Sequence, residues 1–155
     1  MKVIILSLLA VVLASGCTAG KFDFTESDPV MKLIAGSENG GHYIRFNRTH
    51  YQESLAEGKV IHLYFYANWC PICAEERPKI FAAYDRLNYS DVVGYEVHYN
   101  DNEVTNDDLY ITRFYQIPYQ HSTVIIDKEG VVSFKSFAAI GTERLISEIE
   151  RVRVA

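Results

Sequence analysis

Cysteine is scarce in this chain, which has only three, at positions 17, 70 and 73. So small a number excludes a disulfide-rich scaffold, in which several bridges replace a large core. Structural zinc is also disfavoured, because such a site takes four ligands and the chain has a single closely spaced cysteine pair. The five histidines show no ligand spacing, so we expect no metal site.

Positive charge is also in short supply, since 15 lysines and arginines face 20 acidic residues and the formal net charge is −5. No basic stripe is present to neutralise phosphates, so we expect no nucleic-acid partner. Apolar residues make up 48% of the chain, which excludes a disordered protein and is enough for one domain with a real core.

Long hydrophobic runs are absent except near the N-terminus, where Val3 to Leu13 is apolar apart from Ser7. This run is too short to span about 30 Å of hydrocarbon, but it suits the apolar region of a signal peptide. The sequence Leu-Ala-Ser-Gly-Cys that ends at Cys17 is similar to the lipobox of bacterial-type lipoproteins, with Ala14 where leucine is usual. The resemblance implies a signal peptide over residues 1–16 and a diacylglyceryl group on Cys17. The alternative is an ordinary secretory signal with an incidental cysteine.

Residues 17–41 are expected to form a tether, because they are rich in Gly, Ser, Thr, Asp and Glu. A flexible chain of this length reaches roughly 25 Å, enough to hold a domain off a membrane. Residues 30–34 are more apolar and are candidates for a short element that packs on the domain. These features predict a membrane-anchored lipoprotein outside the cytoplasm, in the periplasm or at the cell surface, with its folded domain over residues 42–155.

Strand and helix patterns alternate along this domain. The stretch 60–67 is aromatic and β-branched without helical periodicity, which indicates a strand buried on both faces. We expect strands over 43–46, 60–67 and 92–99, a hairpin of 123–126 and 131–137, and helices over 49–57, 71–87, 106–115 and from a Thr142 cap onward. The order predicts an α/β fold whose central mixed sheet, flanked by helices, ends in a β-hairpin and a C-terminal helix.

The pair Cys70 and Cys73 lies where the buried strand ends and the next helix begins, with Pro71 in the first helical turn. Bare N–H groups and the helix dipole therefore point at the Cys70 sulfur, stabilise its thiolate and make it the attacking sulfur. Cys73, almost one turn on, is placed to resolve a mixed disulfide. A disulfide across so small a loop adds little stability, so redox exchange explains the pair better than a structural bridge.

The stretch Tyr-Phe-Tyr-Ala-Asn-Trp-Cys-Pro-Ile-Cys, residues 64–73, resembles the strand, the Ala-x-Trp-Cys-x-x-Cys motif and the helix of the thioredoxin family. Pro78 matches a helix-kinking proline of that family, and the similarity covers about residues 42 to 153. The resemblance implies a three-layer fold with thiol–disulfide oxidoreductase activity, in which Cys70 is the nucleophile and Cys73 the resolving thiol. Trp69, Pro71 and Ile72 would support the site, Trp69 as an aromatic rim; a plain core or surface aromatic is its alternative.

One departure from the family concerns the proton relay. The family has a buried acid on the strand six residues before the nucleophile, and here that position is Tyr64. A relay to Cys73 must then come from elsewhere, such as Glu76 or water. A glutamate at such a helical position is more commonly exposed, so we expect Glu75, Glu76 and Arg77 to form a solvated helix face.

A second departure concerns the family's cis-proline loop, which faces the disulfide and pairs with the substrate backbone. Two registers are open. Ile-Pro at 117 and 118 resembles the family's dipeptide, but the family's usual offset, counted back from the acidic turn residue Asp127, falls on His121. This offset leads us to favour His121. We expect the peptide bond before His121 to be trans, since a cis bond before a residue other than proline costs about 3 kcal/mol. The substrate-facing loop is then Pro118, Tyr119, Gln120, His121 and Ser122.

These inferences predict a membrane-tethered, extracytoplasmic and reductive thiol–disulfide oxidoreductase. It would act on disulfide-containing proteins or small thiols, with an unidentified redox partner, as a monomer, and without cofactor or metal. The main alternative is a non-catalytic module that grips extended peptides through the 118–122 loop. A peroxiredoxin is disfavoured because Ala67 stands where that class has a threonine.

Overall fold

The computed structural model describes residues 33–37 and 40–155. The predicted signal peptide over 1–16, Cys17 and most of the predicted tether lie outside these residues. The described chain contains the following elements: β1 (Leu33–Gly36), β2 (His42–Arg45), α1 (Arg48–Ala56), β3 (Val60–Tyr66), α2 (Pro71–Tyr84), β4 (Val92–His98), α3 (Asn106–Phe114), β5 (Ser122–Ile126), β6 (Val132–Ser136) and α4 (Gly141–Val154). Within this part of the chain, none of the helices has the length and apolar character that a membrane span requires.

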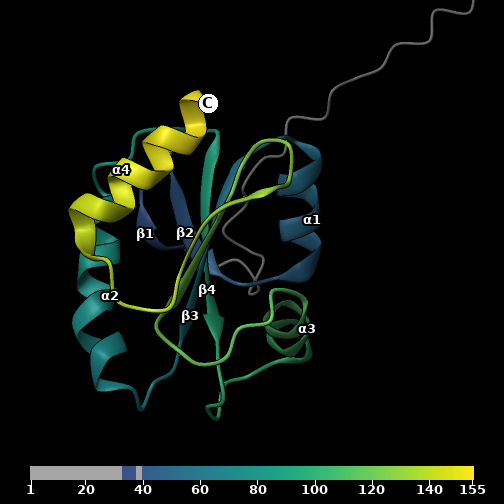
Figure 1. Cartoon of the computed structure of the whole chain (residues 1–155), viewed down its shortest axis with the longest axis vertical. Coiled ribbons are helices and arrows are strands. Elements are labelled where there is room, and N and C mark those ends of the chain that lie inside the picture. The colour runs from purple at the N-terminus through teal and green to yellow at the C-terminus, as the bar shows by residue number, and fades with distance from the viewer. Residues whose placement is uncertain (1–32, 38–39) are drawn as a thin grey trace, which may run out of the picture.

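The strands form one mixed sheet in the order β1-β2-β4-β3-β5-β6. Strands β2, β4 and β3 run parallel, whereas β1, β5 and β6 are antiparallel to their neighbours. Parallel neighbours need crossover connections, and α1 and α2 supply them before and after β3. Helices α1 and α3 cover one face of the sheet, while α2 and α4 cover the other (Figure 1). The predicted α/β class, mixed sheet, closing hairpin and terminal helix are confirmed.

Strand β3 divides the core, because successive side chains of a strand point to opposite faces. Leu63 and Phe65 pack in the cluster under α1 and α3, whereas Tyr64 packs in the cluster under α2 and α4. Residues 60–65 are all buried, as the absence of polar alternation predicts. The two clusters fix β3 from both sides, so the loop that leaves its carboxyl end starts from a rigid support.

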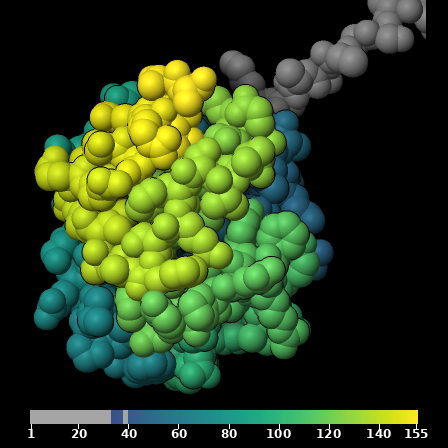
Figure 2. Space-filling view, viewed as in Figure 1, coloured from purple at the N-terminus to yellow at the C-terminus, as the bar shows by residue number. Residues whose placement is uncertain are grey.

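The near side of the molecule is formed by the closing hairpin and α4, with α3 and the loop after it below them (Figure 2). Strand β6 is the exposed edge of the sheet there. Lys135 on this strand donates to the carbonyl of Tyr115, at 2.6 Å. A charged side chain on an edge strand discourages pairing with another chain.

Strand β1 lies inside the segment predicted as a tether, and this corrects the predicted domain boundary. Leu33, Ala35 and Gly36 pair with Ile44, Tyr43 and His42 of β2. The sheet therefore begins before residue 42. The apolar character of residues 30–34 was the only sign of it, because four residues with one register shift carry no clear strand period.

The start of α4 also differs from prediction. Thr142 does not cap the helix; its hydroxyl donates to the carbonyl of Lys79, at 2.9 Å. The cap comes from α2, where Glu76 Oε1 accepts from the backbone N–H groups of Ile140 and Gly141, at 2.8 and 2.7 Å. A carboxylate satisfies these donors and favours the positive end of the helix dipole. One side chain thus joins the two helices that cover the same face.

Candidate active site

Cys70 follows β3 and caps the N-terminus of α2. Its sulfur accepts a hydrogen bond from the backbone N–H of Cys73, at 3.1 Å. Pro71 occupies the first turn, where its missing N–H leaves no donor unsatisfied. The local geometry is therefore the one expected from the strand–Cys-Pro–helix pattern, with the donors and the dipole of α2 directed at one sulfur.

Both cysteines are buried, and Cys70 lies nearer to the open surface. Cys70 is 3% exposed and Cys73 is 0% exposed, and both are thiols in this structure. The residues beside Cys70 are open, since Trp69 is 52% and Ile72 is 48% exposed. A disulfide that approaches this apolar rim meets Cys70 first, and Cys73 lies behind it in the core.

The buried position of Cys73 changes its acidity. Burial, together with the Cys70 sulfur, raises the pKa of the Cys73 thiol to about 11, although the Ala67 backbone and Tyr64 act in the opposite direction. A thiol with this pKa stays protonated at neutral pH. Cys73 must therefore lose a proton at the moment at which it resolves a mixed disulfide.

Tyr64, which stands in the place of the family's buried acid, lies in the same pocket. Burial raises the pKa of Tyr64, and the Cys73 sulfur raises it further, so the phenol stays protonated. Its hydroxyl is buried and has no hydrogen-bond partner among the described residues. The hydroxyl is thus available to donate a hydrogen bond toward a forming Cys73 thiolate. Because it stays protonated, it cannot accept the Cys73 proton as the carboxylate of the family does.

Glu76 is buried, and the expectation of a solvated helix face is wrong at this position. Oxygen Oε1 caps α4, whereas Oε2 is buried without a hydrogen bond among the described residues and lies 3.7 Å from Lys79 Nζ. The carboxylate also acts electrostatically on Tyr64. Its capping contacts give Glu76 a clear structural role, while Tyr64 stands nearer to Cys73.

His121 faces the cysteine pair. Its Nδ1 lies 4.0 Å from the Cys70 sulfur, and its backbone N–H donates to the carbonyl of Phe65 on β3, at 2.7 Å. The φ angle of His121 is +54°, a left-handed conformation in which histidine is several-fold enriched among non-glycine residues. The ring of Tyr119 lies 5.2 Å from the imidazole. Backbone and neighbouring ring together hold the imidazole toward the sulfur.

The rest of the predicted 118–122 loop lies around this histidine. No peptide bond in the described part of the chain is cis, so Pro118 is trans; it is exposed and its carbonyl accepts from the Tyr99 hydroxyl, at 2.7 Å. Gln120 is half-buried, and the buried Ser122 donates to the carbonyl of Tyr119, at 2.8 Å. Of the two registers that the sequence leaves open, the geometry places His121 opposite Cys70.

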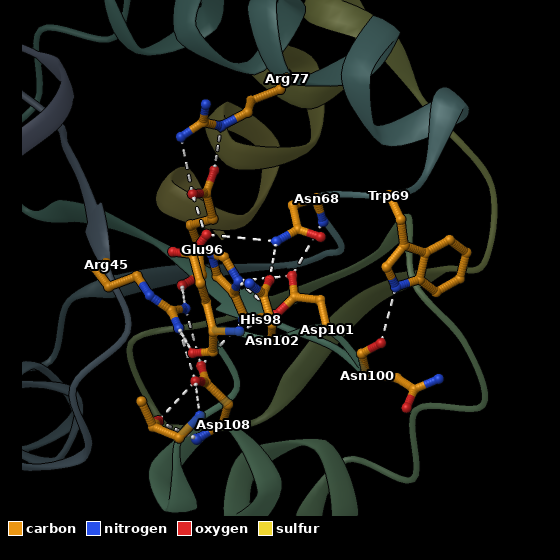
Figure 3. A network of polar contacts seen from close by, with 12 residues as sticks. Arg45, Asn68, Trp69, Arg77, Glu96, His98, Asn100, Asp101, Asn102 and Asp108 are labelled. Carbon is orange, nitrogen blue, oxygen red and sulfur yellow. Dashed lines mark hydrogen bonds and ion pairs between the residues drawn. The ribbon is translucent and has the colours of Figure 1, made fainter.

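A polar network fixes the loop before Cys70 (Figure 3). Trp69 Nε1 donates to the carbonyl of Asn100, at 2.9 Å, and the backbone N–H of Asn68 donates to Asp101, at 3.0 Å. His98 Nδ1 also donates to Asp101. Burial alone would raise the pKa of Asp101, but the hydrogen bonds from His98 and from backbone amides lower it. The segments before Cys70 and after β4 are thus bound into one unit.

Two ion pairs with buried carboxylates lie beside this unit. Arg77 on α2 donates to both oxygens of Glu96 on β4, at 2.7 and 3.0 Å, and Arg45 donates to both oxygens of Asp108, at 3.1 and 2.9 Å. Glu96 and Asp108 are buried. Asp108 also completes the capping box of α3, in which it occupies the third helical position and Thr105 is the N-cap.

Comparisons with known proteins agree with this geometry. No protein-family model matches the chain. Over 84 residues, 54% of the chain, it is 32% identical to the chloroplastic thioredoxin-like protein HCF164 of Oryza sativa subsp. japonica, and the match covers 30% of that protein. Among solved structures, Trxlp from Edwardsiella tarda has a TM-score of 0.58 at 13% identity, over 68% of this chain and 95% of that one. Thioredoxin f from spinach chloroplast has a TM-score of 0.55 at 19% identity, over 74% and 95%.

The chain therefore has the thioredoxin fold, with a Cys-x-x-Cys pair at the N-terminus of α2. The resemblance to the thioredoxin family that the sequence shows is thus confirmed at the level of the fold. The chain spans less than a third of the length of the curated relative that it matches.

Proposed function

We propose that this protein is a thiol–disulfide oxidoreductase that reduces disulfides outside the cytoplasm. The observation that carries the proposal is the position of the Cys70 sulfur, which caps α2, accepts the Cys73 N–H and lies at an open apolar rim. Donors and dipole stabilise the anionic form of a sulfur placed in this way. Insulin reduction by dithiothreitol, compared between the wild type and Cys70→Ser, tests the proposal.

The reaction proceeds by two exchanges. The Cys70 thiolate attacks one sulfur of a substrate disulfide; a bond from Cys70 to that sulfur forms and the other substrate sulfur leaves as a thiolate. Cys73 then loses its proton and attacks the Cys70 sulfur, which releases the second substrate thiolate and forms the Cys70–Cys73 disulfide. Two electrons pass from the protein dithiol to the substrate disulfide. A thiol reductant, which stands for the unidentified redox partner, restores the dithiol, and the cycle needs no cofactor.

The substrate surface is apolar and aromatic. Trp69 and Ile72 flank Cys70, and Tyr119, whose ring lies 5.9 Å from that of Phe137, is also exposed. Such a rim favours extended protein segments with apolar side chains around their disulfide. The alternative function, a peptide-binding module without turnover, would use this same surface, so the thiol chemistry alone separates the two.

We propose the reductive direction because the surroundings of Cys73, unlike those of Cys70, disfavour its anionic form. A strong oxidant owes its potential to a stabilised reduced form, whereas burial raises the pKa of Cys73 to about 11. We expect a reduction potential of about −270 mV, the value of thioredoxin, and not the value of about −120 mV that a strong oxidant has. Equilibration with glutathione buffers, with the disulfide fraction read by mass after alkylation, measures it. A value near the oxidant's would reverse the assigned direction.

We also propose that Cys17 carries a lipid that tethers the domain to a membrane. The support is the sequence before Cys17, since that residue lies outside the described part of the chain. Because one cysteine would hold the lipid, labelled palmitate should enter the wild-type protein in a bacterial host and be absent from Cys17→Ala. Cys73→Ala serves as a matched control and should be labelled normally. Equal labelling of Cys17→Ala and the wild type would contradict the anchor.

A further inference from the structure

The fold brings three potential metal ligands together at the active site. The sulfurs of Cys70 and Cys73 and one ring nitrogen of His121 all lie within 4.8 Å of one another. The Cys70 sulfur and His121 Nδ1 are 4.0 Å apart. The favoured loop register already places His121 near the pair, but its spacing shows no metal motif, because His121 is 48 positions beyond Cys73 and reaches the pair through the antiparallel pairing of β5 with β3.

The separations suit a shared metal ion. With metal–sulfur bonds of about 2.3 Å and metal–nitrogen bonds of about 2.0 Å, three ligands in a plane around one ion lie about 3.7–4.0 Å apart. The observed separation between Cys70 and His121 already has this value, and the whole group needs shifts below about 1 Å. The cysteine thiols and the histidine ring can make such shifts by small side-chain rotations.

The third ligand is also held in place before any ion binds. The N–H of His121 is tied to Phe65, its backbone is left-handed, and Tyr119 packs against its ring. Non-glycine residues in this conformation cluster at functional sites, where the surrounding structure supports their strain. Nothing in β5 itself requires a histidine here, because the strand begins at the next residue.

The ligand set favours a soft ion with a low coordination number. Thiolates select Cu(I), zinc or iron–sulfur clusters, and zinc in proteins takes four ligands. Within the described residues, the group contains no fourth histidine, cysteine or carboxylate. Both cysteines are almost inaccessible to water, which leaves little room for a solvent ligand on zinc. Three-coordinate Cu(I) needs neither a fourth protein ligand nor a bound water molecule.

We propose that the reduced site is a Cu(I)-binding site formed by Cys70, Cys73 and His121. Binding replaces the remaining thiol proton by the metal, with no change in oxidation state. When a substrate disulfide accepts two electrons from the copper-free dithiol, the resulting Cys70–Cys73 disulfide lacks both thiolate ligands and cannot bind the ion. The site therefore holds copper only in its dithiol form, and bound copper blocks Cys70 as a nucleophile. The inference uses the cysteines of the proposed function but does not require turnover.

The experiment titrates Cu(I), buffered by bathocuproine disulfonate, into the reduced full chain without oxygen. A Cys17→Ser background leaves the active-site pair as the only thiols. We expect a single Cu(I) to bind and to block alkylation of Cys70. His121→Asn should weaken binding at least about 100-fold, since even outer-shell partners of a metal site cost about 10–100-fold. Asparagine tolerates the left-handed backbone, and His121→Gly provides a second unstrained variant.

His42→Ala is the matched control. His42 begins β2 and pairs with Val93, at the opposite end of the parallel strands from Cys70. Its removal should leave the Cu(I) affinity unchanged. X-ray absorption should show two sulfurs and one nitrogen around the wild-type copper, and sulfurs alone in the His121 variants.

Equal Cu(I) affinity in the wild type and both His121 variants would overturn the proposal, as would tighter binding of Zn(II) than of Cu(I). The two proposals fail separately. If the protein reduces insulin but does not bind copper, only the copper-site proposal is contradicted. If the protein binds copper but does not reduce insulin, only the proposed oxidoreductase function is contradicted.

Discussion

Replacing Cys70 by serine should reduce the turnover of insulin to the rate of dithiothreitol alone. The reason is chemical, because a serine hydroxyl at the N-terminus of α2 still accepts the Cys73 N–H but cannot form a disulfide with substrate. Cys73 cannot take over, since it is buried and burial raises its pKa to about 11. Insulin precipitation, followed by turbidity with equal protein concentrations, measures the effect.

The variant Cys73→Ser, compared with Cys70→Ser, separates the attacking role from the resolving role. It keeps the attacking sulfur but lacks the resolving one, so it should also lose turnover while it accumulates a mixed disulfide with glutathione on Cys70. Cys70→Ser should form no such adduct. Thermal unfolding of both variants checks that each is folded. If Cys70→Ser accelerated insulin reduction as the wild type does, the protein would be a peptide-binding module and not an oxidoreductase.

The parts of the site that the sequence predicts are local ones. The strand end, Cys70, Pro71 and Cys73 lie within a few residues of one another, so neighbouring sterics and helix capping determine their arrangement. The structure places all of them where the pattern predicts. The alternation of elements is likewise predictable, because a strand buried on both faces and short helices have distinct patterns.

The parts that the sequence did not predict depend on contacts between distant segments. Glu76 caps a helix that begins 65 positions later, so its own helical pattern could not distinguish it from a solvated glutamate. Asn68 and Trp69 are held by residues after β4, and only the parallel pairing of β3 with β4 brings these loops together. A run such as 100–103, rich in Asn and Asp directly after a buried strand, was the available signal for this network.

Replacing Asp108 by alanine should have the largest effect on stability, a loss of about 3–5 kcal/mol in the free energy of unfolding. Asp108 is fully buried and accepts hydrogen bonds from Arg45, from Thr105 and from the backbone N–H of His98. Its removal leaves the partly buried Arg45 guanidinium without its counter-charge and breaks the capping box of α3. Urea unfolding, followed by Trp69 fluorescence, measures the change.

The neighbouring substitution Asp107→Ala is the matched control. Asp107 lies in the same first turn, but among the described residues its side chain accepts a hydrogen bond only from the backbone N–H of Arg48, so its loss should cost about 0.5–1.5 kcal/mol. Adding Arg45→Leu to Asp108→Ala should recover part of the stability, because most of the penalty comes from an unpaired charge rather than from a lost attraction. If the two aspartate variants unfolded at the same urea concentration, Asp108 would be an ordinary helix cap, and its ion pair with Arg45 would not hold α3 against β2.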